Sequence, residues 1–196
     1  MKTTKATPAK RESLRGSLPT VVLQNASRSR RVPQQRSIRR WAGAALRLPA
    51  CVTVRVVGTA EGLRLNHAWR GRAYATNVLS FGYGRSDGRL QGDLVLCASV
   101  VASEARRQRK PLAAHYAHLI VHGLLHLQGY DHEREDDAVR MQRRERMILK
   151  GLGFADPYAE PEAEPKAKPE AKPEANPKAA PAVKPSADAR SPGKHG

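Results

Sequence analysis

The stretch His122-Gly-Leu-Leu-His126-Leu-Gln-Gly129-Tyr-Asp-His132 decides both the fold and the chemistry expected of this chain. On an α-helix, residues four apart lie on the same face, so His122 and His126 can bind one ion together. Gly129 can take the left-handed conformation that ends a helix, which turns the chain back and brings His132 to the same point. Three neutral imidazoles with one open position commonly hold a catalytic zinc ion. The stretch therefore predicts a zincin-like site on a helix and its glycine turn.

This spacing is also that of the metzincin proteases, but Gly123 occupies the position of their glutamate base. A peptidase built this way would lack the group that deprotonates its zinc-bound water, so the pattern favours a metal site over a protease. The alternative is a set of hydrogen-bonded core histidines, which three histidines at ligand spacing make less favoured. His118, one turn earlier, is expected to pack or to support a ligand, and His115 is expected on the helix face.

The 196 residues carry a net charge of +17, which is unevenly distributed. Residues 1–47 hold 12 Lys and Arg against one acid, residues 48–155 hold 16 against 10, and residues 156–196 hold 7 of each. A basic surplus of this kind predicts a polyanionic partner, nucleic acid before membrane. The alternative is a basic surface that is merely solvated.

The chain has two isolated cysteines, Cys51 and Cys97, and no disulfide framework, which favours a reducing cytoplasm. It has no apolar run of membrane-spanning length and no apolar signal-peptide core, so no membrane association is expected. The basic, Thr- and Ser-containing N-terminus favours a disordered arm over a transit peptide.

The pattern predicts an α/β (α+β) domain over residues 19–155, between a disordered basic arm at 1–18 and a disordered tail at 156–196, where proline recurs every fourth residue. Strands are expected at 20–24, 51–57, 77–81 and 90–97, the last two as a hairpin-like pair joined by a flexible, glycine-rich turn cluster at 82–88. Helices are expected at 34–48, 59–70, 100–110, 111–127 and 133–150. Leu63 and Leu65 should face inward from the second helix, and Val139 and Met147 from the last. We therefore expect a small mixed sheet packed by about five helices, with the histidine helix over the sheet.

Four motifs together resemble the YbeY family of bacterial rRNA maturation factors, which are described as zinc-dependent endoribonucleases. They are Asn66-x-x-Trp69-Arg70-Gly, Thr76-Asn-Val-Leu-Ser-Phe81, Gly92-Asp-Leu-Val and the histidine stretch from His118 to His132. The resemblance runs from about residue 20 to Tyr158. It departs from the usual pattern at Gly82, where a proline often follows the phenylalanine.

The resemblance implies one zinc ion on His122, His126 and His132, and a cleft between their helix and a sheet edge. It places the functionally important arginine of the family at Arg70. It also implies single-strand-directed cleavage in late maturation of the 3′ end of small-subunit rRNA and in ribosome quality control. The implied partners are rRNA or a small-subunit precursor, extending to a ribosomal protein or an assembly GTPase.

In a hydrolytic mechanism, Arg70 would neutralise charge that develops on the phosphoryl oxygens; the alternative is a surface arginine or a structural ion pair. Asp131 could orient an imidazole or accept a proton, or it could cap the loop. No general base is evident. Two rival functions therefore stand beside the nuclease: a non-catalytic rRNA-binding assembly factor with a structural metal, and a degenerate metalloprotease.

Overall fold

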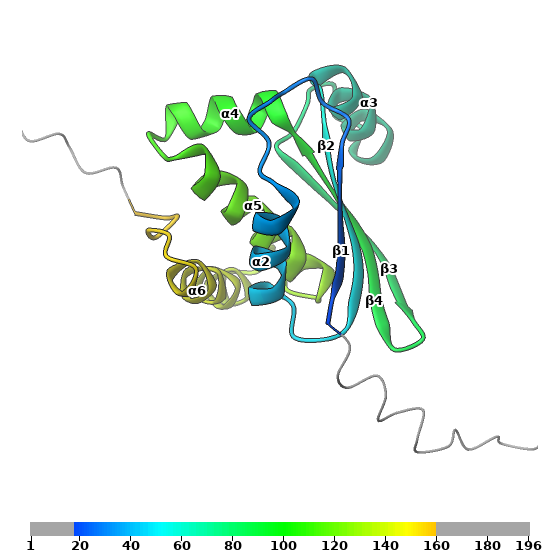
Figure 1. Ribbon diagram of the computed structural model, residues 1–196, viewed down its shortest axis with the longest axis vertical. Coiled ribbons are helices and arrows are strands. Elements are labelled where there is room, and N and C mark those ends of the chain that lie inside the picture. Colours follow the sequence, from blue (N-terminus) through cyan, green and yellow to red (C-terminus); the bar gives the residue numbers. More distant parts are fainter. Residues whose placement is uncertain (1–17, 160–196) are drawn as a thin grey trace, which may run out of the picture. The chain divides into compact units, whose positions relative to one another are not determined.

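The computed structural model describes residues 18–159, which form four strands and five helices (Figure 1). In chain order they are β1 (Thr20–Asn25), α2 (Gln35–Ala45), β2 (Ala50–Val57), α3 (Thr59–Arg70), β3 (Val78–Ser86), β4 (Arg89–Cys97), α4 (Ala98–Arg107), α5 (Leu112–Leu127) and α6 (Glu135–Gly151). The predicted α/β class, with a small sheet and about five helices, is confirmed. The predicted arm and tail lie outside the described residues, except for residues 18 and 156–159.

The four strands form one mixed sheet in the order β1-β2-β4-β3. β2 pairs in parallel with both β1 and β4, whereas β3 runs antiparallel to β4. A parallel pair needs a crossover connection, which α2 provides between β1 and β2. The central strand β2 is rich in valine, and Val52, Val54 and Val56 are buried, as β-branched residues of an interior strand usually are.

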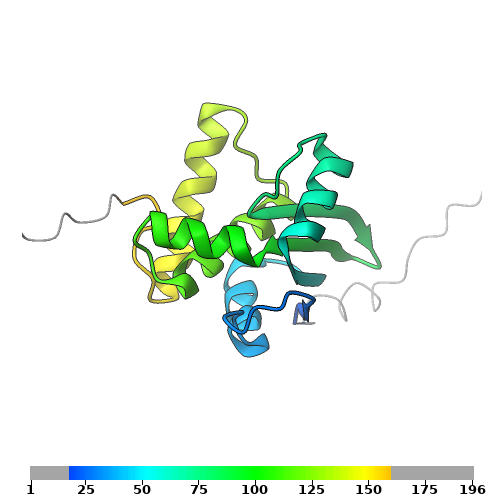
Figure 2. The same ribbon diagram turned by 90° about the horizontal axis from the view of Figure 1, so that it is seen from above.

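Helices cover the two faces of the sheet unequally. On one face, Ile38 of α2 and Ile120 of α5 share a buried cluster with Val54 and Leu94. On the other face, α3 contributes Leu65 to a smaller cluster. Figure 1 shows α2, α4, α5 and α6 together on one side of the strands. Seen from above, α4 runs from the region of α3 towards α6 (Figure 2). The larger cluster therefore fixes α5, which carries the histidines, on the sheet.

Two glycines allow α5 to lie close to the sheet. A Cβ atom at Gly123 would lie 2.7 Å from Leu94 Cδ2 and 2.9 Å from Ser80 Oγ. A Cβ atom at Gly92 would lie 2.8 Å from Leu127 Cδ1. Because real Cβ atoms essentially never show such contacts, a side chain at either position would force its neighbours to shift. The histidine helix is therefore held over β3 and β4, as the sequence predicted.

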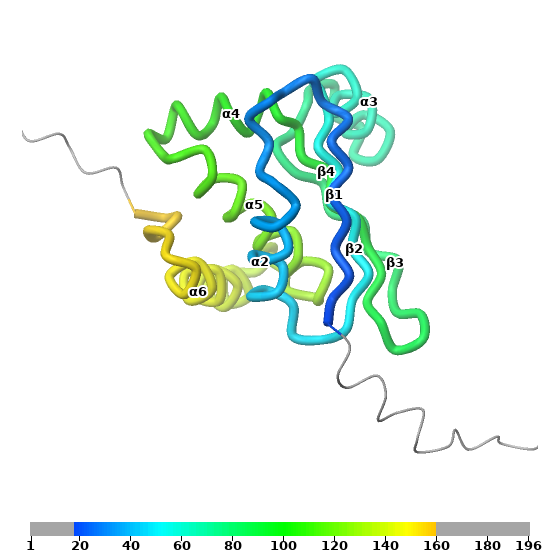
Figure 3. The backbone as a smooth tube through the Cα atoms, viewed as in Figure 1, coloured from blue at the N-terminus to red at the C-terminus, as the bar shows by residue number. Residues whose placement is uncertain are grey.

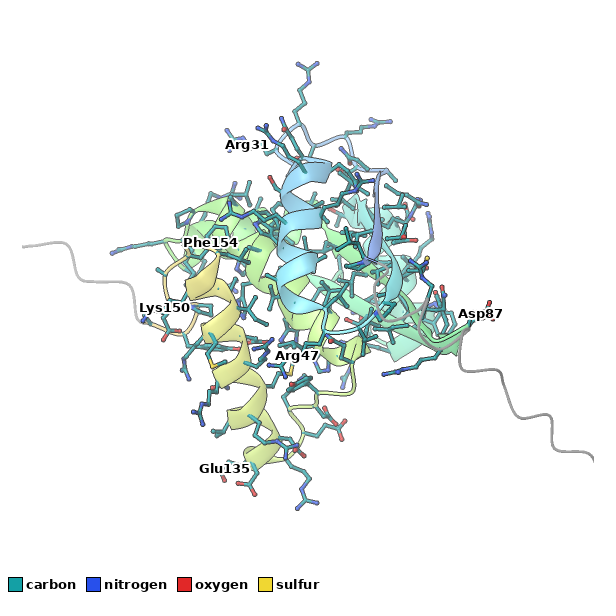
Figure 4. The ribbon with its side chains drawn as sticks, turned by 60° about the horizontal axis from the view of Figure 1, so that its bottom comes forward. Arg31, Arg47, Asp87, Glu135, Lys150 and Phe154 are labelled. Carbon is teal, nitrogen blue, oxygen red and sulfur yellow. The ribbon has the colours of Figure 1, made fainter. Side chains whose placement is uncertain are left out.

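The third and fourth strands form the expected hairpin-like pair, but their connection is a tight turn and not the longer flexible connection expected over residues 82–88. β3 continues to Ser86 and β4 begins at Arg89. Asp87 and Gly88 have φ angles of 51° and 75°, as a two-residue type I′ turn requires. Gly84, also with a positive φ, lies within the strand beside a register shift. Figure 3 shows the sharp return of the chain, and Figure 4 labels Asp87 at the tip.

The inward faces of two helices differ from those expected. In α3, Leu63 is 40% exposed, and Gly62 and Asn66 are buried in its place. In α6, Val139 and Met147 are both more than half exposed. Both helices have more than one stripe of apolar residues, so helical spacing alone does not determine which stripe meets the sheet or α5.

The last described residues pack against the domain. Lys110 Nζ donates a hydrogen bond to the carbonyl of Pro157, which is itself buried. Residues 156–159, predicted as part of the tail, therefore lie with the domain. Among the helices of residues 18–159, none combines the length and the hydropathy needed to cross a membrane.

Candidate metal centre

The turn after α5 has the geometry expected from its glycine. Gly129 has a φ of 89°, in the left-handed region. Its N–H donates to the carbonyl of His126 at 2.9 Å, and the N–H of Tyr130 donates to the carbonyl of Leu125 at 3.1 Å. This pair of bonds is a Schellman motif, which ends a helix and reverses the chain. The residues that follow therefore pass back over the end of α5, and His132 lies beside the helical histidines.

The structure brings the three predicted ligands together. One ligand atom from each of His122, His126 and His132 lies within 4.8 Å of the other two. The Nε2 atoms of His122 and His126 are 3.1 Å apart. Two nitrogens bound tetrahedrally to one zinc ion at ordinary bond lengths are about 3.3 Å apart. The spacing of these two atoms is therefore close to what a shared ion requires.

A carboxylate that the sequence analysis did not identify supports the first histidine. Glu145 of α6 is fully buried, and its Oε1 lies 2.8 Å from His122 Nδ1. The Tyr158 hydroxyl donates to Oε2 of the same carboxylate. Burial would raise the pKa of Glu145, but the nearby His118 and the hydrogen bonds from His122 and Tyr158 outweigh it and lower the pKa to about 2. Glu145 is therefore an anion at neutral pH, and burial raises the pKa of the Tyr158 hydroxyl that donates to it.

The ionised carboxylate determines which nitrogen of His122 carries its proton. Because Glu145 can only accept, His122 Nδ1 must donate, which leaves the lone pair of a neutral imidazole on Nε2. That lone pair faces His126 Nε2. Burial lowers the pKa of His126, and the nearby His122 and His132 lower it further. A backbone hydrogen bond with Tyr130 raises it by less, so the neutral form of His126 is favoured. Unprotonated nitrogens that converge in this way fit a cation.

A second group of potential ligands, His118, His122 and Glu145, is also compact. His118 Nε2 lies 3.4 Å from Glu145 Oε2, which is too long for a good hydrogen bond, and that buried nitrogen has no hydrogen-bond partner among the described residues. Since Glu145 already accepts from His122 and Tyr158, we regard this group as support for the first site. His118 thus lies next to the carboxylate rather than next to the ligand nitrogens.

The three histidines open into a polar cavity of about 540 Å³, and Arg70 lines the same cavity. Arg70 is the last residue of α3, and the chain turns immediately after it because Gly71 adopts a left-handed conformation, with a φ of 65°. The Arg70 side chain is exposed and forms no ion pair with any of residues 18–159. The alternative of a structural ion pair therefore has no support in the described part of the chain.

Asp131 lines this cavity too, but its contact is with the backbone. Its Oδ1 accepts the N–H of His132 at 2.7 Å. This contact supports the loop-capping alternative, because no hydrogen bond joins the carboxylate to an imidazole within residues 18–159. Glu133, which the sequence analysis did not single out, also lines the cavity.

His115, expected on the helix face, is in fact buried, with 3% of its surface exposed. Its Nε2 lies 2.9 Å from Glu104 Oε2, and Asn77 Nδ2 donates to the same oxygen at 3.0 Å. Asn77 lines the cavity and immediately precedes β3, and its Oδ1 accepts the N–H of Val78, the first residue of that strand. His115 therefore belongs to a buried network behind the cavity.

The sequence contained a signal for Glu145 that the apolar pattern of its helix concealed. Met141, Glu145 and Ile148 are spaced four and three apart, and all three are buried. An acidic residue within a buried stripe needs a partner, and unpaired histidines are the natural candidates. No comparable signal pointed to Tyr158, because it follows the domain in a proline-rich region.

The fold and this cluster define an α/β protein with a three-histidine site of the kind that holds a hydrolytic metal. A sequence model of the family described as Endoribonuclease YbeY matches residues 23–153. The chain belongs to the YbeY family.

Several curated relatives carry the name Endoribonuclease YbeY. The protein of Aromatoleum aromaticum is 59% identical over 135 residues, which cover 69% of this chain and 85% of that protein. The protein of Alkalilimnicola ehrlichii is 54% identical over 65% of this chain and 82% of its own length. That of Nitrosomonas eutropha is 50% identical over 70% and 97%, respectively. A solution structure of a Thermotoga maritima protein shares 18% identity and has a TM-score of 0.45, over 70% of this chain and 99% of that one.

Proposed function

We propose that this protein is a metal-dependent endoribonuclease whose zinc ion is held by His122, His126 and His132. The observation that carries the proposal is the convergence of these three imidazoles on a polar cavity that Arg70 also lines. The names of the YbeY relatives support RNA as the substrate. The described residues carry 23 Lys and Arg against 11 acids, which supports a polyanion.

In this proposal, the histidines would hold the metal with the support of Glu145, and Arg70 would bind the phosphate of the RNA. His122 and His126 are presented by one helical face, and Glu145 holds the proton of His122 on Nδ1 so that Nε2 can bind a metal. When bound, a zinc ion supplies Lewis-acid chemistry that activates water or a ribose hydroxyl near neutral pH. Arg70 faces the same cavity and would pair with the phosphoryl oxygens through its planar guanidinium group.

We further propose that the physiological substrate is the 3′ end of small-subunit rRNA, in the cytoplasm, during late subunit maturation and quality control. The support is the family membership and the basic charge. A ribosomal protein or an assembly GTPase would then bind the same small-subunit precursor. The cavity is lined by the first residues of β3, which is an edge strand of the sheet, and single-stranded RNA is the form whose unpaired nucleotides such a site can take.

The test compares wild type with His126→Ala and Arg70→Ala, with Arg72→Ala as a matched control that lies outside the cavity. Bound metal is measured by elemental analysis and cleavage is measured on a precursor rRNA fragment. His126→Ala should lose both metal and cleavage. Arg70→Ala should keep the metal and lose cleavage by about 10²–10³-fold, while Arg72→Ala behaves as wild type.

Equal cleavage by all four proteins would show that a contaminating nuclease is responsible. RNA binding without cleavage by well-metallated wild type would favour the assembly-factor function with a structural metal. Turnover of peptides would favour the degenerate protease, which Gly123 leaves without its base.

A further inference from the structure

A second cavity, of about 480 Å³, lies on the other side of the turn that carries His132. One wall is a face of α6, where Arg140, Arg143, Arg144 and Met147 are spaced three, four and seven residues from the first. Residues with this spacing lie on the same side of a helix. Figure 4 shows α6 between Glu135 and Lys150. We call this space the arginine cavity.

The arginine cavity has an excess of positive charge. Two carboxylates also line it, and one of these, Asp137, pairs with Arg140 at 2.9 Å. Arg143 is exposed and forms no ion pair within residues 18–159, and Arg144 Nε is buried without a hydrogen-bond partner there. The exposed Arg143 guanidinium can therefore pair with an anionic oxygen in the cavity, where charge-assisted hydrogen bonds are strong.

The opposite wall of the arginine cavity is formed by residues 128–131, including Tyr130. Tyr130 is partly buried against the main core, so its ring is held in place. Arginine and tyrosine side chains are the groups on which unpaired bases stack, with Arg also pairing with phosphate. A phosphate with an attached base therefore matches the cavity better than an acidic side chain, which would use only its charge.

The two cavities share one wall. Asp131 lines both the arginine cavity and the histidine cavity, so only the turn from Gly129 to His132 separates them. A chain that places one phosphate at the histidines can cross this turn and place a neighbouring nucleotide against α6. A single free nucleotide is too short to occupy both cavities at once.

We propose that the arginine cavity binds a nucleotide of single-stranded RNA that flanks the phosphate at the three histidines. Arg143 and Arg144 contact its phosphate, and Tyr130 supports its base. This inference rests on the proposed function, and it adds a binding site that fixes the position of the RNA strand relative to the metal.

The test measures affinity for a single-stranded 2′-O-methyl RNA oligonucleotide by fluorescence anisotropy as a function of salt. Arg140→Glu/Arg143→Glu reverses two charges at the cavity, and Arg106→Glu/Arg107→Glu makes the same change at the exposed end of α4. The cavity variant should bind roughly tenfold more weakly than the α4 variant. Its salt slope should fall by about 0.7, as expected for the loss of the phosphate contact of Arg143 on a single strand.

Arg143→Ala provides a milder variant in case the double reversal perturbs folding, and it should lower affinity in the same direction. Equal losses in the cavity and α4 variants, or full RNA affinity in the cavity variants, would overturn the inference. Full RNA affinity together with lost binding of an acidic protein would reassign the cavity to a protein partner. Cleavage is measured separately. If wild type cleaves RNA and the cavity variants bind RNA normally, the proposed nuclease function stands and the proposed nucleotide site is wrong. If wild type does not cleave RNA but the cavity variants bind RNA more weakly, the nucleotide site stands and the proposed nuclease function is wrong.

Discussion

Glu145 and His122 are 23 residues apart in the chain, yet Glu145 Oε1 lies 2.8 Å from His122 Nδ1. The carboxylate comes from α6 and reaches the histidine from the side opposite the cavity. This contact determines which nitrogen of the imidazole is free to bind a metal. It also joins the last helix of the domain to the candidate site.

The first prediction concerns this carboxylate. Glu145→Gln keeps the size of the side chain but removes its charge, so the Nδ1 proton of His122 is held less firmly. We expect zinc affinity to fall by about 10–100-fold, as it does when other carboxylates behind metal-binding histidines are changed. The affinity is measured by competition with a chromophoric chelator.

The control is Glu135→Gln, in the exposed first turn of the same helix. It changes the net charge by the same amount and should leave zinc affinity unchanged. Equal affinities for Glu145→Gln and wild type would mean that the carboxylate does not support the site.

The second prediction concerns the close contact between α5 and the sheet. Gly123→Ala gains about 0.5–1 kcal/mol from helix propensity. It also forces a methyl group against the side chain of Leu94, which is fully buried, so the surrounding core must shift. Overpacking of this kind costs about 1–3 kcal/mol, so the free energy of unfolding should fall.

Gly43 in α2 provides the matched control, because a Cβ atom there would meet nothing within 4 Å. Gly43→Ala should raise the free energy of unfolding by about 0.5–1 kcal/mol. Urea denaturation measures both variants. A stabilised Gly123→Ala protein would show that the helix can move away from the sheet at little cost.

The third prediction concerns Tyr158, whose hydroxyl donates to Glu145 Oε2. Tyr158→Phe keeps the ring, which lies edge-on to His118 with centroids 5.4 Å apart, and removes only the donor. The buried, charged carboxylate then loses one hydrogen-bond donor. Since hydrogen bonds to charged groups are worth about 1.5–3 kcal/mol, we expect the free energy of unfolding to fall by that amount. Tyr74→Phe, at an exposed tyrosine, should have no such effect in the same urea titration.

The fourth prediction is a pH dependence that arises from His115. Burial lowers the pKa of His115 and outweighs the raising effect of Glu104; His118 and Lys110 also lower it. Protonation would place a second N–H on Nδ1, which is buried and has no partner among residues 18–159. The unfolded chain, with an ordinary histidine pKa of about 6.5, therefore binds the proton more readily than the folded one.

Because the folded-state pKa is the lower one, the contribution of His115 is fully present above about pH 6.5 and is lost as the pH falls below that value. His115→Gln cannot titrate, so its deficit relative to wild type should shrink between pH 7.5 and pH 5.5. Urea titrations at the two pH values measure this difference. A deficit that grows on acidification would indicate that His115 is charged in the folded protein.

The sequence was sufficient for the features that depend on local periodicity. The spacing of His122, His126 and His132, with Gly129 as the helix end, predicted a cluster that the structure brings together. The valine-rich strand at 51–57 likewise predicted the centre of the sheet. Both conclusions depend on interactions between residues close together in the chain.

The features that the sequence analysis missed depend on contacts between distant segments. Glu145 acquires its role only because α6 packs on α5, which no local pattern states. The glycines at 82 and 84 resemble a loop until β4 is present to pair with them, and only then does Asp87-Gly88 stand out as the turn. Met147 is likewise exposed because a different apolar stripe of α6 packs against α5.

The missing side chain at Gly123 has a consequence for how this architecture can change over evolutionary time. A glutamate there would convert the histidine stretch into a protease signature with a single codon exchange, yet Leu94 and Ser80 occupy the space that its first carbon would need. Packing thus opposes this exchange before any question of chemistry arises. A hydrolase with glycine at this position takes its proton acceptor from another side chain, the solvent or the substrate.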